Sequence, residues 1–240
     1  MAEQEYRQTR FRRPRGSTEL LLVRHGASEP AVPGRRFPLV GGHGDPALAP
    51  EGQEQAQRVA DRLAREHLDA IYVTNLRRTA ETAAPLAERL GMTPLVEADL
   101  REVHLGEWEG GLFRQRMAEG DPIALQVRSE ERWDLIPGAE PQEVFVDRVR
   151  SGIERIVAAH PDQRVAVFAH GGTIGLLMNL AVGGGRGFAF VGSDNGSISH
   201  LVAIGGHWIV RRFNDTSHLQ DGFDLDPVPD LPEGQGGPSA

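Results

Sequence analysis

The sequence predicts a three-layer α/β/α domain around a mostly parallel, mixed sheet, and three observations support this prediction. Short apolar strands alternate with segments of helical spacing along most of the chain. The run at residues 165–169 is wholly apolar, which is typical of a strand at the centre of a parallel sheet. Two strand-like segments joined by Gly205 and Gly206 predict a closing hairpin, so at least one strand runs antiparallel.

The first half of the chain contains predicted strands and helices in alternation. The strands are expected at residues 19–23, 70–73 and 94–96, and the helices at residues 51–66 and 76–90. The first helix follows Pro50, a residue favoured at helix starts, and its apolar residues recur at helical spacing. The second helix stops at Gly91, because glycine readily adopts the left-handed conformation that ends helices.

The second half continues this alternation after a segment that is harder to assign. Residues 110–136 have the composition of short helices interrupted at residues 120–122. A longer helix is predicted at 141–160, a strand at 164–169, a helix at 173–182 and the hairpin strands at 197–204 and 207–213. In sheets of this type, ligands bind beyond the carboxyl ends of the strands, so the residues there are the candidates for function.

The two ends of the chain lie outside the predicted domain, which spans residues 17–222. Residues 1–16 are polar and carry five arginines, so we expect a basic, flexible arm. Residues 223–240 are rich in proline, glycine and acid, which predicts a disordered tail. A nucleic-acid role for the arm is disfavoured because the whole chain carries a net charge of −8.

The composition excludes several kinds of chemistry. The chain of 240 residues contains no cysteine, and its 26 residues of the lysine and arginine type are all arginine. Thiolate nucleophiles, cysteine-ligated zinc, lysine-dependent phosphate loops and Schiff bases are therefore excluded. An anion must be held by arginine, histidine, backbone N–H groups or a metal. The longest apolar run near the start is too short for a signal peptide or membrane span, so we expect a cytoplasmic protein without membrane or nucleic-acid partners.

Two predicted strands end in the same way, with a histidine followed by glycine. Arg24 and His25 follow the first strand, and His170 and Gly171 follow the central strand. If these strands are neighbours, both imidazole rings face one crevice. Arg78 lies near the start of the second helix, where N–H groups and the helix dipole favour an anion. These groups predict a phosphate pocket, since guanidinium groups match phosphate oxygens and a neutral imidazole attacks phosphorus.

A carboxyl group near this pocket would protonate the oxygen that leaves phosphorus. Glu102, in the loop after the third strand, is the candidate, and Glu107 and Glu109 are alternatives nearby in the sequence. His43 and Asp45 stand two residues apart, yet no third ligand has suitable spacing. We therefore interpret them as a polar rim of the pocket and predict no metal site.

Several further side chains have two interpretations. His104 either contacts substrate or packs, and Trp108 is more typical of the core or the pocket wall than of an aromatic residue that recognises substrate. Four arginines either clamp the substrate or solubilise the surface, the latter being the commoner role: Arg35, Arg36, Arg114 and Arg116. Arg77 is interpreted as a solvated charge.

The stretches around these residues resemble the histidine phosphatase superfamily, in its phosphoglycerate-mutase-like branch. Five blocks match the family's motifs in the family's order, within about residues 17–215. The blocks lie at residues 24–26, 45–56, 76–83, 102–110 and 170–172. One departure is Thr79, where the family has alanine. The resemblance implies a sheet of six strands and a helical lid, residues 104–140, that sets specificity.

The resemblance also implies a role for each matching residue. His25 would attack phosphorus and become phosphohistidine, while Glu102 would act as general acid and then as general base. The phosphoryl oxygens would be bound by a set of cationic and polar groups: Arg24, Ser28, Arg78, His170 and the N–H of Gly171. No metal and no cofactor is required, and the partner would be a small phosphorylated substrate or inorganic phosphate.

Departures from the mutases of this family favour hydrolysis. Mutases carry an asparagine six residues after the nucleophilic histidine, where this chain has Ala31, and a pair of lid arginines that is missing here. We therefore expect an acid-phosphatase-like phosphomonoesterase, most active at mildly acidic pH because Glu102 must start protonated. The alternatives are a phosphoglycerate mutase and a non-catalytic protein that binds phosphorylated ligands. A homodimer is compatible with the sequence, which does not name the natural substrate.

Overall fold

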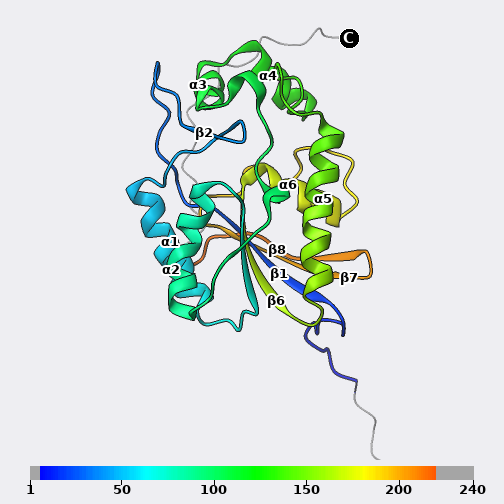
Figure 1. Cartoon of the computed structure of the whole chain (residues 1–240). Coiled ribbons are helices and arrows are strands. Elements are labelled where there is room, and N and C mark those ends of the chain that lie inside the picture. Colours follow the sequence, from blue (N-terminus) through cyan, green and yellow to red (C-terminus); the bar gives the residue numbers. More distant parts are fainter. Residues whose placement is uncertain (1–5, 220–240) are drawn as a thin grey trace, which may run out of the picture.

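A six-stranded sheet forms the centre of the protein in the computed structural model, which describes residues 6–219 (Figure 1). Its strands are β1 (Thr18–Arg24), β4 (Ala70–Val73), β5 (Leu95–Val96), β6 (Arg164–Ala169), β7 (Ile198–Ile204) and β8 (His207–Asp215). They are arranged in the order β5-β4-β6-β1-β7-β8. Among these strands β7 alone runs opposite to the other five, so the predicted mixed, mostly parallel sheet is confirmed.

Alternating side chains of β1 show how the sheet is covered on both faces. Leu20 and Leu22 pack with apolar residues of α5 (Gln142–Ala159) and α6 (Gly171–Ala181). Leu21 and Val23 point the other way, toward α1 (Pro50–Leu63) and α2 (Arg77–Leu90), because successive side chains of a strand face opposite sides. Figure 1 shows α1 and α2 on one side of the sheet and α5 on the other. The predicted three-layer α/β/α architecture is confirmed.

The register of the sheet brings the ends of β1 and β6 together. The two strands are parallel neighbours, and Arg24 pairs with Ala169 at their carboxyl ends. The next residue of each chain segment is a histidine, so His25 and His170 leave the sheet side by side. The neighbouring strand β4 ends at Val73, which pairs with Phe168, and this places the start of α2 at the same edge.

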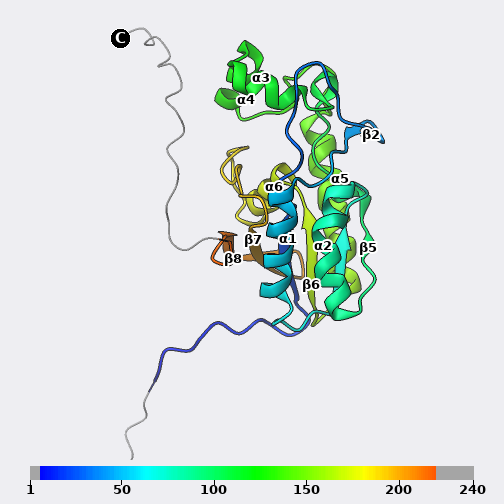
Figure 2. The same cartoon turned by 90° about the vertical axis from the view of Figure 1, so that its left-hand side faces the viewer.

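The predicted lid, residues 104–140, lies beyond this edge of the sheet (Figure 2). We call it the lid segment. It contains the 3₁₀ helix η2 (Gly106–Trp108) and the helices α3 (Leu112–Glu119) and α4 (Pro122–Glu130). Trp108, Ala124, Val127 and Ile136 form a small core of their own there, to which neighbouring apolar side chains add. The short helices predicted for residues 110–136 are thus present, and the break between them falls at residues 120–121.

Some element boundaries differ from the prediction. Helix α6 begins at Gly171, two residues earlier than expected, directly after His170. A small hairpin of β2 (Leu39–Val40) and β3 (His43–Gly44) was not predicted, because strands of two residues have no readable alternation. The 3₁₀ helix η1 (Ala98–Leu100) precedes the loop that carries Glu102.

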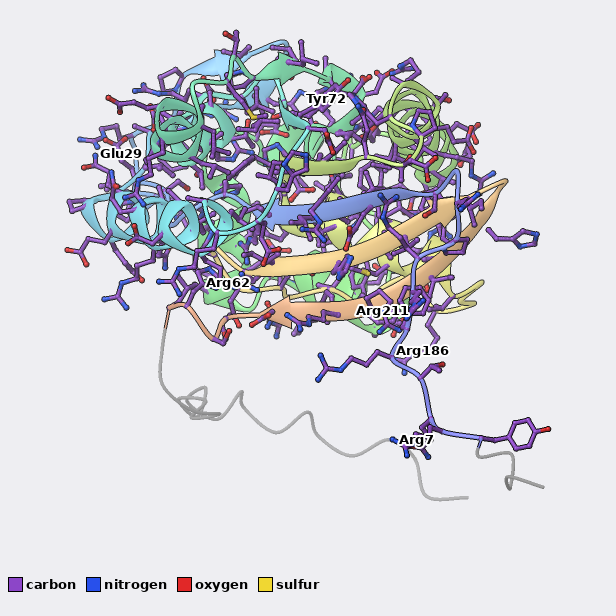
Figure 3. The ribbon with its side chains drawn as sticks, turned by 90° about the horizontal axis from the view of Figure 1, so that it is seen from below. Arg7, Glu29, Arg62, Tyr72, Arg186 and Arg211 are labelled. Carbon is purple, nitrogen blue, oxygen red and sulfur yellow. The ribbon has the colours of Figure 1, made fainter. Side chains whose placement is uncertain are left out.

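The described part of the N-terminal arm, residues 6–16, contains no helix or strand and is exposed over nearly its whole length. It runs beside β8, where the guanidinium of Arg211 lies 3.9 Å from the centre of the Phe11 ring (Figure 3). The tail predicted at 223–240 lies outside the described residues. Within residues 6–219, no helix combines the length and the apolar character needed to cross a membrane.

Candidate active site

His25 lies at the carboxyl end of β1 and is 6% exposed. Its backbone N–H donates to the carbonyl oxygen of Ala169, 3.1 Å away on the neighbouring strand. Its Nδ1 lies 2.7 Å from the carbonyl oxygen of Gly26, which only accepts, so the ring proton resides on Nδ1. Burial, followed by the charges of Arg78 and Arg24, lowers the pKa of His25 well below its usual 6.5. The ring is therefore neutral and keeps a lone pair on Nε2.

His170 is completely buried beside His25, with 5.3 Å between the ring centres. Its Nε2 lies 3.0 Å from the hydroxyl oxygen of Thr74, and its Nδ1 has no hydrogen-bond partner among the described residues. Burial and the charge of Arg78 lower the pKa of His170 well below 6.5. A buried polar nitrogen without a partner is costly in a stable core, so this atom is suited to contact a ligand.

Arg24 and Arg78 place two cations beside these rings. Arg24 is anchored by the carbonyl oxygen of Ser193, and its Nε is buried without a partner among residues 6–219. Arg78 donates from Nη1 to the carbonyl oxygen of Gly44 at 2.8 Å. Burial lowers the pKa of both guanidinium groups, and the charge of Glu102 opposes this. Both remain cations at neutral pH, because the ordinary pKa of arginine lies above 12.

The carboxylate of Glu102 sits at the N-terminus of α6. Oε2 accepts from the N–H of Gly172 at 3.0 Å, and Oε1 accepts from Thr173 at 3.2 Å and Val103 at 3.0 Å. A side chain at position 172 would collide with this carboxylate, since a Cβ there would lie 2.6 Å from Oε1 of Glu102. A larger residue at position 172 would therefore force the carboxylate to shift from this place at the helix end.

The two alternative carboxylates are placed differently. Glu107 is exposed and does not line the cavity described below. Glu109 is buried, and its oxygens accept from the N–H of Leu105 at 2.9 Å and of Gly44 at 2.6 Å, which ties the lid segment to β3. Glu109 also lines the cavity and acts electrostatically on Arg78, whereas Glu102 acts on both Arg24 and Arg78, so Glu102 is the carboxylate best placed for chemistry at this site.

These groups open into a cavity of about 290 Å³ between the sheet edge and the lid segment. The sheet side is polar and includes Arg24, His25 and Arg78, while the lid side is rich in aromatic rings. Arg114, from α3, also lines the cavity and donates to the carbonyl oxygen of Glu29 at 2.9 Å and to the hydroxyl of Ser28 at 2.7 Å. The site thus combines a neutral imidazole, three arginines and a carboxylate, which suits the binding and attack of a phosphate group.

Comparison with known proteins agrees with this geometry. The family model described as the histidine phosphatase superfamily, branch 1, matches residues 20–216. The chain belongs to the histidine phosphatase superfamily. It is 33% identical to phosphoglycerate mutase-like protein 4 of Arabidopsis thaliana, a match that covers 85% of this chain and 87% of the relative. It is 31% identical to the metal-independent phosphoserine phosphatase of the same plant, over 88% of this chain and 90% of the relative.

A solved structure shows the same fold. The mycobacterial glucosyl-3-phosphoglycerate phosphatase superposes with a TM-score of 0.71 at 28% identity, over 83% of this chain and 100% of that one. The resemblance, the fold and the enzyme class expected from the sequence are confirmed: this histidine phosphatase is a phosphoric monoester hydrolase.

Most of the predicted site residues of this histidine phosphatase meet in space. Arg24, His25, Arg78 and Glu102 line the cavity, and His170 contacts the His25 ring edge-on without lining the cavity itself. Gly171 begins α6, so its N–H has no partner within the helix, and a Cβ there would lie 3.4 Å from Nε of Arg24.

Other candidates have different surroundings. The hydroxyl of Ser28 accepts from Arg114 and does not line the cavity. His43 lines the cavity, whereas Asp45 accepts from the N–H of Arg77, the first residue of α2, and so caps that helix. His104 packs edge-on against His43, with 4.9 Å between ring centres. Within the described chain, no three histidine, aspartate or glutamate residues form a group that could hold a metal ion.

Sequence reasoning missed one residue that shapes the site, Arg148 on α5. Its guanidinium donates to carbonyl oxygens of the loop that ends at Glu102 and to the carboxylate of Glu140. No local motif surrounds this arginine, and only its position on the sheet-facing half of a long helix could have drawn attention to it.

Proposed function

We propose that the protein hydrolyses small phosphate monoesters without a metal, through a phosphohistidine on His25. The observation that carries the proposal is the state of the His25 ring. It is neutral, its Nδ1–H is held by the carbonyl of Gly26, and its Nε2 lone pair lies among Arg24 and Arg78. A fixed imidazole with an available lone pair beside two cations is the arrangement that nucleophilic attack on phosphorus needs.

In the first step, Nε2 of His25 attacks phosphorus and forms a P–N bond while the P–O bond to the alcohol breaks. The departing oxygen takes the proton of Glu102. Positive charge develops on the imidazole, and the Nδ1–H bond to the Gly26 carbonyl stabilises it. Arg24 and Arg78 neutralise the oxygens of the transferring group, with His170 and the N–H of Gly171 as further donors.

In the second step, water attacks the phosphohistidine. Glu102, now a carboxylate, takes a proton from the water, the P–N bond breaks and inorganic phosphate leaves. Three N–H groups hold the Glu102 carboxylate in the position from which it exchanges this proton.

The experiment is phosphate release from p-nitrophenyl phosphate with EDTA present, alongside conversion of 3-phosphoglycerate to 2-phosphoglycerate. We expect EDTA-resistant release, no isomerisation, and a loss of more than about a thousandfold in His25→Ala. His207→Ala, an exposed histidine on β8, is the matched control. Labelled phosphate should also be trapped on the wild-type protein after a rapid alkaline quench. Substantial activity in His25→Ala would remove His25 as the nucleophile, and isomerisation would make the enzyme a mutase.

A further inference from the structure

The lid side of the cavity is an array of aromatic rings. Trp108, Phe113 and Trp133 line it from the lid segment, and Phe37 lines it from the loop before β2. The ring centres of Trp108 and Phe113 are 6.3 Å apart, and those of Phe113 and Trp133 are 5.9 Å apart. Three neighbouring rings therefore form a continuous apolar surface that faces the phosphate-binding groups.

The polar side chains on this side of the cavity already have partners within the protein. Both oxygens of Glu109 accept backbone N–H groups, and Arg114 donates to Glu29 and Ser28. His43 differs, because its Nε2 is buried and unpaired among the described residues. Its Nδ1 lies 3.2 Å from the carbonyl oxygen of Gly41, which assigns the proton to Nδ1 and leaves Nε2 as a single acceptor.

A substrate with many hydroxyl groups would lose water here and find few partners besides Arg114 and Nε2 of His43. An aromatic ring would instead bury apolar area against other rings in edge-on or offset contacts. The volume of about 290 Å³ leaves room for a phosphate and one such ring.

We propose that this enzyme prefers phosphate monoesters whose alcohol carries an aromatic ring, which the rings of Phe113 and Trp133 bind. The proposal rests on the proposed phosphatase function and names its substrate class. The residues that bind the phosphate group contact the same group in every ester, so they do not distinguish one alcohol from another. The aromatic rings of the lid segment therefore determine which ester is selected.

The test compares esters of primary alcohols, so that the basicity of the leaving group is nearly constant. We expect kcat/KM for 2-phenylethyl phosphate to exceed that for ethyl phosphate, phosphoserine and 3-phosphoglycerate by at least about tenfold, mainly through KM. Trp133→Ala should reduce the ratio of phenylethyl to ethyl ester to less than about threefold. Phe113→Leu, which keeps the apolar volume but removes the ring, should reduce it as well. Trp208→Phe, on β8 and away from the cavity, should keep the ratio.

The outcomes separate the two proposals. Faster turnover of phosphoserine or 3-phosphoglycerate, or ratios that both lid variants leave intact, would overturn the preference while the phosphatase function stands. If neither these four esters nor p-nitrophenyl phosphate is hydrolysed, the proposed function is overturned and the preference falls with it, whereas hydrolysis of p-nitrophenyl phosphate alone overturns only the preference.

Discussion

Arg148 on α5 donates to the main-chain carbonyl oxygen of Glu102 at 2.8 Å, so a helix that packs beside η1, on the same face of the sheet, holds the loop of the proposed acid. The same guanidinium donates to the carbonyl oxygens of Asp99 at 2.7 Å and Arg101 at 2.8 Å. Glu140 pairs with Arg148 and also accepts from the N–H of His104. Because the planar guanidinium satisfies several acceptors at once, it fixes the loop in one position.

Arg148→Lys should therefore slow the chemistry that depends on Glu102. Lysine keeps the charge but cannot bridge three carbonyl groups. We expect kcat to fall about tenfold for ethyl phosphate and less than about threefold for p-nitrophenyl phosphate, whose leaving group needs little protonation. Glu102→Gln should show the same contrast more strongly. Equal slowing of both esters would assign Arg148 a purely structural role, and Arg150→Lys, exposed on the same helix, is the control.

Gly172→Ala should displace the Glu102 carboxylate, because the new Cβ would lie 2.6 Å from Oε1. Alanine suits a helix, so the thermal midpoint should change little while kcat falls by about tenfold or more. Kinetics and thermal denaturation on the same preparation distinguish these effects. Gly185→Ala is the control, since a Cβ there meets nothing within 4 Å. Unchanged kcat in Gly172→Ala would mean that the carboxylate position is unimportant.

The pH dependence follows from the low pKa of His25. Its neutral form persists well below pH 6.5, so the nucleophile keeps its lone pair in mildly acidic solution. We expect kcat/KM for an alkyl phosphate to hold or rise as the pH falls from about 7.5 to 5.5. Measuring kcat/KM for this ester from about pH 5 to 9 tests the prediction. A decline centred near pH 6.5 on the acidic side would show that His25 titrates like an ordinary histidine.

Glu19 at the start of β1 makes a separate prediction about stability. Its pKa is lowered from 4.5 to about 2 by its contacts with His200 and Arg164, against the opposing effect of burial. The carboxylate thus contributes stability above pH 4.5, and this is lost as the pH falls toward 2. Glu19→Gln should lower the free energy of unfolding by about 2 kcal/mol at pH 7 and by less at pH 3. An equal loss at both pH values in urea denaturation would contradict this assignment.

The central part of the site could be predicted because it depends on regular structure. Runs of apolar residues identify the buried strands in the sequence, and the carboxyl ends of parallel strands meet at one edge of a sheet. His25 and His170 could therefore be expected side by side from the sequence alone. Only the neighbour relation of β1 and β6 had to be supplied by the structure, which pairs Arg24 with Ala169.

The support of the site could not be predicted in the same way. Arg148 donates to carbonyl oxygens of a loop almost fifty residues away in the sequence. Every residue has a backbone carbonyl, so the pattern of side chains does not indicate which carbonyl groups an arginine binds. Arg114 was set aside because exposed arginines are common, yet it lines the cavity next to Phe37. The small hairpin around His43 was missed because its strands are only two residues long and partly exposed.

The lid segment carries its own small core around Trp108, Val127 and Ile136, separate from the cores that hold the sheet. His25 follows the end of β1 and Glu102 lies in the loop before the lid segment, whereas the aromatic wall comes largely from this one continuous stretch of chain. The groups proposed for catalysis and the surface proposed for selectivity therefore lie largely in different segments of the chain, which can change independently. Grafting residues 104–140 from a relative is accordingly a practical route to a new substrate range, provided that Arg114 and Glu140 are kept.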